Sequence, residues 1–188
     1  MVFDDTTDAW KSALFSPRRF FSGKTKVDSS LSLCWVIGAA LLVFLCSSLV
    51  IGIGNWPFNV LSVLSLDQAE YIIYMVAFLS VLFYLVSALV FAAAGYMGGK
   101  GSILRQAGLM AAYTVPLFLA YSFLSWVITF FSGDYLPLAL LVIVSLAYTY
   151  FTYLLVRSEH KLHAFSSLVA AVIPLVLLLA WLVPLMTS

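Results

Sequence analysis

The sequence contains few charged residues, and none of them lies within its long apolar stretches. Asp, Glu, Lys and Arg together make up 9% of its 188 residues, whereas 64% are hydrophobic and the mean hydropathy is +1.10. An ordinary soluble domain has about 25% charged residues. Such a chain cannot cover a water-facing surface. A soluble globular protein is therefore excluded, and no nucleic-acid partner is expected.

Cysteines are also scarce, since Cys34 and Cys46 are the only two. Both fall in one apolar stretch, and on a helix they would lie about 18 Å apart, which is too far for a disulfide bond. We interpret them as small buried hydrophobic residues. The N-terminal region also lacks the apolar core of a signal peptide, so no cleavable signal is expected.

Ionisable residues are missing from the depth of the apolar stretches. Five long stretches contain no Asp, Glu, Lys or Arg. Intramembrane proteases and ion-coupled transporters need such groups inside the bilayer, where protons, metals or charged substrates are handled. The sequence therefore predicts a protein that is not an enzyme, with no catalytic residues, no metal site and no cofactor.

What the sequence does contain is apolar length. Each of the five stretches can cross a hydrocarbon core about 30 Å thick, which takes about 20 helical residues. Length and the need to satisfy backbone hydrogen bonds in lipid both favour helices over strands. We predict an all-α integral membrane protein, with a cytoplasmic amphipathic tail (1–30) and a five-helix transmembrane bundle (31–188). The approximate spans are residues 31–54, 71–97, 106–131, 135–156 and 164–187.

The basic residues lie only in the tail and in alternate loops. The loop between the first two spans, the loop between the third and fourth, and the C-terminal end have none. By the positive-inside rule, the N-terminus is cytoplasmic and the C-terminus lies outside. The nine residues are Lys11, Arg18, Arg19, Lys24 and Lys26 in the tail, Lys100 and Arg105 after the second span, and Arg157 and Lys161 after the fourth.

The tail has the pattern of an interfacial segment. Apolar residues recur at helical spacing around Trp10, and Ser16-Pro17 can open a second helix as N-cap and first-turn proline. A tail that is solvated and only sets the topology is the alternative. The residues that follow offer cations for lipid phosphates and aromatic rings for the bilayer interface, namely Arg18, Arg19, Phe20 and Phe21.

Prolines and small residues mark the interior of the spans. Pro116 and Pro174 each remove one backbone hydrogen bond, so we predict kinks in the third and fifth spans. Small residues four positions apart allow close approach of helices. Packing within the bundle is the preferred interpretation, and a homo-oligomer interface is the alternative. The pairs are Ala88/Ala92, Gly108/Ala112 and Ser167/Ala171.

The loop Gly98–Ser102 reads Gly-Gly-Lys-Gly-Ser. It departs from the nucleotide-binding pattern, in which Gly-Lys is followed directly by Ser or Thr and a strand precedes the loop. We therefore expect no nucleotide site. Lys100 and Arg105 could instead bind a lipid phosphate, together with backbone amides at the start of the next helix.

A short polar turn contains Glu159, His160 and His163. Two histidines and one carboxylate on a short loop make a weak metal-ligand set. The preferred interpretation is a polar turn at the membrane interface. The alternative is a metal site, which is also the only feature here that could support an enzyme.

Three motifs resemble those of the Yip family, the Ypt/Rab-interacting membrane proteins. The resemblance covers nearly the whole chain and implies a five-span helical protein with a cytoplasmic N-terminus. The motifs are Pro-Arg-Arg-Phe-Phe (17–21); the glycine loop leading through Arg105-Gln106 to Ala-Tyr-Thr-Val-Pro (112–116); and Arg-Ser-Glu-His (157–160) before a last span with Ala164 and Pro174.

The family resemblance also implies a function. Eukaryotic members engage prenylated Rab-type GTPases through a longer cytosolic region, which contains an Asp-Leu-Tyr-Gly-Pro type of element that is missing here. The chain is therefore similar to a prokaryotic relative, expected in the plasma membrane. We predict a scaffold that binds lipids or partner membrane proteins, small GTPases among them, at its basic cytoplasmic face. The alternative is a channel or carrier for a neutral or apolar solute, in which Pro116 and Pro174 open a cavity.

Overall fold

A computed structural model describes residues 2–22, 29–54, 66–132 and 135–187 of the chain. Throughout these ranges the regular secondary structure is helical. The helices are α1 (Val2–Phe15), α2 (Pro17–Ser22), α3 (Ser29–Gly54), α5 (Leu66–Tyr96), α6 (Ile103–Ser132), α7 (Tyr135–Glu159) and α8 (Ala164–Thr187).

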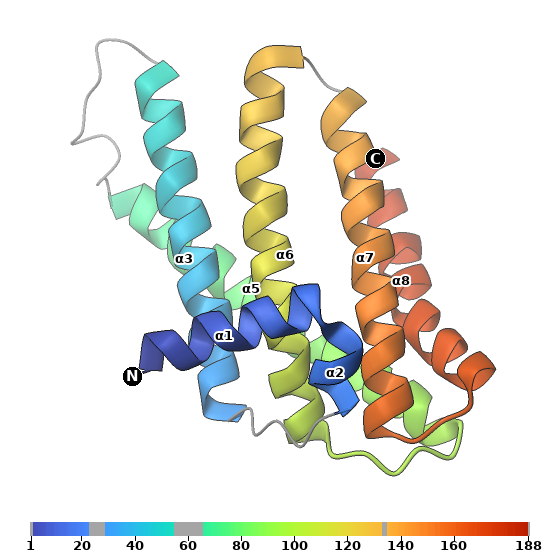
Figure 1. The fold of residues 1–188 in the computed structure, drawn as a ribbon. Coiled ribbons are helices and arrows are strands. Elements are labelled where there is room, and N and C mark those ends of the chain that lie inside the picture. Colours follow the sequence, from blue (N-terminus) through green and yellow to red (C-terminus); the bar gives the residue numbers. More distant parts are fainter. Residues whose placement is uncertain (1, 23–28, 55–65, 133–134, 188) are drawn as a thin grey trace.

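Five long helices form a bundle, and two short helices lie across it (Figure 1). α6 packs against α3 on one side and α7 on the other, while α8 contacts α5 and α7. α1 crosses the front of α3 and α6, and α2 packs against α7. The tail therefore covers the same end of the bundle as the loop from α5 to α6 and the turn from α7 to α8.

The outer surface of the bundle is apolar, as expected for helices that face lipid. Large hydrophobic side chains are exposed on every long helix, for example Val81, Val127 and Leu146. Over the described residues, three helices are long and apolar enough to cross a membrane. They are Ile72–Tyr96, Ile103–Ile128 and Ala139–Glu159. The all-α integral membrane fold is confirmed.

The count of five crossings stays a prediction. α3 and α8 are 26 and 24 residues long, but their described apolar parts are the shorter stretches Ser32–Cys46 and Ala164–Pro174. The orientation in the membrane and the boundaries of the tail and the membrane domain are likewise predictions. Lys24 and Lys26 lie outside the described residues.

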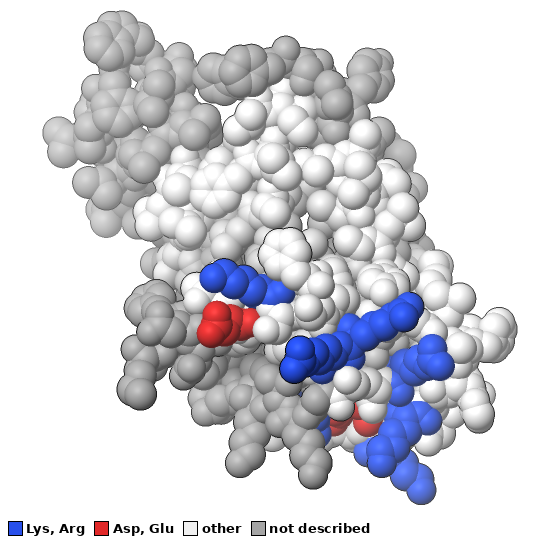
Figure 2. Space-filling view, viewed as in Figure 1, with Lys and Arg blue, Asp and Glu red and all other residues white. Residues whose placement is uncertain are grey.

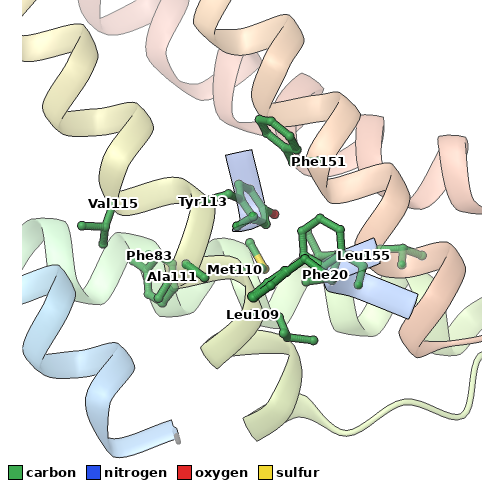
Figure 3. Close-up of a cluster of buried hydrophobic side chains, with 14 of the residues drawn as sticks. Phe20, Phe83, Leu109, Met110, Ala111, Tyr113, Val115, Phe151 and Leu155 are labelled. Carbon is green, nitrogen blue, oxygen red and sulfur yellow. The ribbon is translucent and has the colours of Figure 1, made fainter. Parts of the chain in front are cut away.

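A cluster of buried hydrophobic side chains lies near the end that the tail covers (Figure 3). Leu109, Met110 and Tyr113 of α6 are at most 1% exposed, and Leu155 of α7 packs among them. The Tyr113 hydroxyl lies 2.8 Å from Thr152 Oγ1, and the Thr152 hydroxyl donates to the Tyr148 carbonyl. The hydroxyls of Tyr113 and Thr152 therefore both have partners, as buried polar groups in a membrane protein require.

The two proline positions do not end their helices. α6 continues through Pro116 and α8 through Pro174, while the predicted kinks stay predictions. Of the small-residue pairs, Gly108/Ala112 and Ser167/Ala171 are buried inside the bundle, which agrees with internal packing. Ala92 of the third pair is exposed.

The tail forms the two expected helices but packs differently from the expectation. The Ser16 carbonyl accepts the Phe20 amide at 2.9 Å, so Ser16 caps α2 and Pro17 occupies its first turn. Phe20 and Phe21 are each 4% exposed and lie in the protein core, not at a lipid interface as the sequence suggested. The reason is that α6 and α7 supply an apolar surface of their own, on which the centroid of the Phe21 ring lies 5.9 Å from that of Tyr113.

Candidate functional site

The glycine loop, residues 98–102, begins with a tight helix end. Gly98 has φ +89°, a backbone conformation that side chains other than glycine rarely adopt. Its N–H donates to the Gly95 carbonyl and the Gly99 N–H to the Ala94 carbonyl, both at 2.9 Å. This pair of bonds is the Schellman motif, which satisfies the last carbonyls of α5. The chain thereby turns sharply into the loop.

His160 joins the glycine loop to three helices. The Gly101 N–H donates to His160 Nδ1 at 3.2 Å, so Nδ1 has no proton and Nε2 carries it. Nε2 then donates to Gln106 Oε1 at 2.7 Å, and Gln106 Nε2 donates to the Ser87 carbonyl at 2.8 Å. His160 and Gln106 are both buried. One buried chain of hydrogen bonds thus connects the loop, α5, α6 and the end of α7.

Two glycines are required by the closeness of this ring. A Cβ on Gly99 would lie 2.8 Å from His160 Cβ and from the Ala94 carbonyl oxygen. A Cβ on Gly101 would lie 2.7 Å from His160 Cε1. Real Cβ atoms do not approach other heavy atoms so closely, so only glycine fits at both positions without a shift of the ring or the loop.

Glu159 adds a second, polar connection at the rim. Its Oε2 lies 3.2 Å from Arg105 Nε, and the Ser102 amide donates to its Oε1 at 3.4 Å. Arg105 is 44% exposed and Glu159 9%. The ion pair is part solvated, so its main effect is to fix the position of the Arg105 side chain and the start of α6.

The protonation state of His160 follows from this setting. Burial lowers the pKa of His160 below its ordinary value of 6.5, and the Glu159 carboxylate opposes that shift in part. The neutral ring suits its partners, because a protonated Nδ1 would point a second hydrogen at the Gly101 N–H. Both ring nitrogens are engaged by the protein, which leaves neither for a metal ion. In the described part of the chain, no three His, Cys, Asp or Glu residues are grouped as metal ligands would be.

The basic side chains gather over the covered end of the bundle. Figure 2 shows them, with a few acidic side chains among them, on the half of the molecule where α1, α2 and the loops lie; in this view the described surface of the other half shows neither sign of charge. Arg18, Arg19 and Lys100 are exposed. We call this surface the basic face; its described members are Lys11, Arg18, Arg19, Lys100, Arg105, Arg157 and Lys161.

Sequence reasoning found the loop and the turn separately but missed their contact. It also missed Gln106 and Ser87, which carry the contact into the bundle. A signal was present, because Gln106 is the only carboxamide in the five apolar stretches. A buried amide in a membrane helix needs a partner, and the short turn at His160 is a nearby source of one.

An apolar cavity of about 460 Å³ lies deeper in the bundle. All five long helices contribute to its wall, among them α3 through Val36, α6 through Val115 and α8 through Pro174. The sequence predicted, for a carrier, a cavity opened by Pro116 and Pro174 in the third and fifth spans. Of these two prolines, Pro174 lines the cavity.

Comparison with known proteins identifies one family. The Yip1 domain model matches residues 11–185, which is nearly the whole chain. No curated protein and no solved structure matches it. The match includes the basic part of the tail, the glycine loop and the His160 turn, so the elements that meet in the structure all lie within the matched region.

Proposed function

This chain belongs to the Yip1 domain family, and from that premise we propose that it is a non-enzymatic membrane scaffold. Its basic face binds the phosphate groups of anionic lipids and partner membrane proteins, small GTPases among them. The face lies in the cytoplasm, the C-terminus lies outside, and the membrane is a prokaryotic plasma membrane.

The observation that carries this proposal is that the described lysines and arginines gather at one end of the bundle, where Figure 2 also shows a few acidic side chains. Cations near a membrane surface contribute about 1 kcal/mol each to attraction by anionic lipids. Arg18, Arg19 and Lys100 are exposed, and Lys100 sits on a loop whose position is set by the His160 contacts. A fixed loop presents its cation at lower entropic cost than a mobile one.

Phe20 and Phe21 support this surface indirectly. Their burial between α6 and α7 anchors α2, so that the neighbouring Arg18 and Arg19 point outward from a defined helix. In this proposal Phe20 and Phe21 hold α2 in place, and Arg18 and Arg19 make the contact with lipid.

Flotation with vesicles tests the lipid contact. The full chain in zwitterionic nanodiscs is mixed with phosphatidylcholine vesicles that contain phosphatidylglycerol. Changing Arg18, Arg19, Lys100 and Arg105 to Gln should weaken co-flotation by at least about tenfold, since each lost cation removes about 1 kcal/mol. The binding of the wild-type chain should also fall with added salt.

The matched control keeps the charge and exchanges the side chains, as Arg18→Lys, Arg19→Lys, Lys100→Arg and Arg105→Lys. It should retain the binding. Equal flotation of the neutralised and wild-type chains would disprove the lipid contact. Co-purification of membrane partners with the same two variants tests the scaffold function separately.

The carrier of an apolar solute is a second candidate, because the cavity beside Pro174 gives such a solute a place to bind. Its wall is almost entirely apolar, which disfavours a polar solute. Flux measurements in proteoliposomes distinguish the two functions, since a scaffold moves no solute across the bilayer.

A further inference from the structure

The cavity is bounded by the five long helices near the middle of their length. Its wall includes Phe83 and Val86 of α5, Val115 of α6, and Tyr148 of α7. On α5, α6 and α7 the lining residues lie about 10 to 18 positions from the helix ends that meet the glycine loop and the His160 turn. At 1.5 Å per residue this is about 15–27 Å of depth, which reaches the middle of a hydrocarbon core about 30 Å thick.

The size of the cavity is that of a ligand site. Binding pockets for small molecules span about 300–1,000 Å³, and this one has a volume of about 460 Å³. An apolar cavity of about 150 Å³ is enough to hold one benzene molecule. Three times that volume accommodates on the order of eighteen carbon atoms, which is the size of one long aliphatic chain.

The chemistry of the wall selects a hydrocarbon. Nearly all of its surface is carbon. Thr114 lines the cavity, but its Oγ1 is buried and has no hydrogen-bond partner among the described residues. Water is disfavoured in such a space, because it finds too few polar partners. A chain of CH₂ groups loses no hydrogen bonds on entry and gains contacts with the wall.

The cavity also has access to the bilayer. Leu141 of α7 lines the cavity and is 43% exposed, and the protein encloses the cavity only in part. In a membrane the outer surface of the bundle is surrounded by lipid chains, so the solvent at the opening is itself aliphatic. No other ligand class is present there at comparable concentration.

We propose that this cavity is a binding site for one aliphatic chain of a membrane lipid, which enters between the helices from the bilayer. The chain fills a space that would otherwise leave the centre of the bundle without packing contacts. Occupancy requires neither the basic face nor net transport, so it stands apart from both functions proposed above.

Photolabelling of the full chain tests the site. The protein is reconstituted with phosphatidylcholine that has a diazirine in the middle of one acyl chain, and labelled residues are mapped by mass spectrometry. Wild-type protein should be labelled at the cavity residues Val115 and Phe118, as well as at outward residues of the same helix such as Leu124. Ala40, a lining residue that is 1% exposed, offers a way to fill the space.

Ala40→Phe should lower labelling at Val115 and Phe118 severalfold relative to Leu124, because the added ring takes up about a third of the cavity and leaves too little space for a long chain. Ala40→Leu is a milder filling variant and should lower it less. The matched control is Val127→Phe, on the lipid-facing side of α6, which should leave labelling of the cavity unchanged. Thermal unfolding of each variant confirms that it is folded.

Two further photolabelling experiments identify which molecule enters the cavity. A free fatty acid with the same diazirine distinguishes a free chain from that of a phospholipid, and labelling of the cavity by either supports the proposal. Thr114→Val should leave cavity labelling intact, since a hydrocarbon needs no hydroxyl. Labelling confined to outward residues, or cavity labelling that both Ala40 variants leave unchanged, would overturn the proposal.

Discussion

At the scale of single residues, the contact between His160 and the glycine loop explains why small residues are needed there. Gly99 and Gly101 leave room for the imidazole, and Gly98 supplies the positive φ of the turn. Each of the three glycines thus has a separate physical reason. Gly95, by contrast, has nothing within 4 Å of the position of a Cβ.

The change Gly101→Ala tests this contact. Its Cβ would overlap the His160 ring, and overpacking of this kind destabilises a protein by about 1–3 kcal/mol. Thermal unfolding in detergent measures the loss. Gly95→Ala is the control in a helix, where alanine should stabilise by about 0.5–1 kcal/mol. Removal of the ring by His160→Ala should make Gly101→Ala nearly neutral, and a penalty that persists in the double variant contradicts the contact.

The titration of His160 gives a pH dependence with a defined sign. The pKa of His160 is lowered in the folded protein, so at a pH below about 6.5 the unfolded chain takes up a proton first. The contribution of neutral His160 to the free energy of unfolding is complete above a pH of about 6.5. It falls as the pH drops toward the lower pKa of His160 in the folded protein. The charged groups around the ring are Glu159 and Arg105, which pair with each other; Phe91 and Gln106 face it without charge.

Melting temperatures measured from pH 8 to pH 5 test this sign. The wild-type chain should lose stability below a pH of about 6.5, whereas His160→Gln should show a flatter profile. His163→Gln is the matched control, because His163 is exposed, and its profile should follow that of the wild type. A profile of His160→Gln that parallels the wild type would show that another group is responsible.

At the scale of elements, the tail is part of the folded bundle. α1 and α2 bury Ala13, Phe20 and Phe21 against α6 and α7, and Trp10 packs edge-on against Trp35 of α3 at 6.0 Å. The tail therefore owes its position to protein contacts. Its cations remain outside because they occupy the opposite side of the same helices.

Phe21→Ala should release this element. Truncation of a buried Phe costs about 3–5 kcal/mol, which is large compared with the other contacts that a six-residue helix can make. Hydrogen exchange of residues 2–22 should speed up strongly, while the core of α6 stays protected. Phe15→Ala is the matched control, because Phe15 is 83% exposed. If the two variants exchange alike, the tail is held by other contacts.

At the scale of the whole molecule, the arrangement of charge is the property that ties fold to proposed function. Segments far apart in sequence bring their cations to one end of the bundle (Figure 1, Figure 2). The apolar cavity lies deeper in the bundle, so the two proposed ligand contacts are at different depths. One involves lipid phosphates at the surface, and the other an aliphatic chain in the middle.

Labelling of single cysteines tests the five crossings. In a chain with Cys34→Ser and Cys46→Ser, a membrane-impermeant maleimide is applied to intact cells that carry Ser12→Cys, Ser102→Cys or Ser188→Cys. Ser188→Cys should react from outside, whereas the other two should react only after permeabilisation. Reaction of Ser102→Cys and Ser188→Cys from the same side would mean that α8 does not cross. If Ser12→Cys and Ser102→Cys react from opposite sides of the membrane, α3 does not cross it.

The sequence by itself determined the class of the protein. Uncharged apolar stretches of about 20 residues or more leave a lipid-facing helix as the stable structure, and local patterns such as Ser16-Pro17 placed the start of α2. These features depend on neighbours in the chain. The family resemblance was equally readable, since its motifs are contiguous.

Only the tertiary structure decided which side chains meet. The burial of Phe20 and Phe21 depended on the surfaces of α6 and α7, which no tail pattern encodes. The chain from Gly101 through His160 and Gln106 to Ser87 joins residues from three parts of the sequence. The cavity depends on how five helices pack, because an empty space is a property of the assembled bundle and of no single segment.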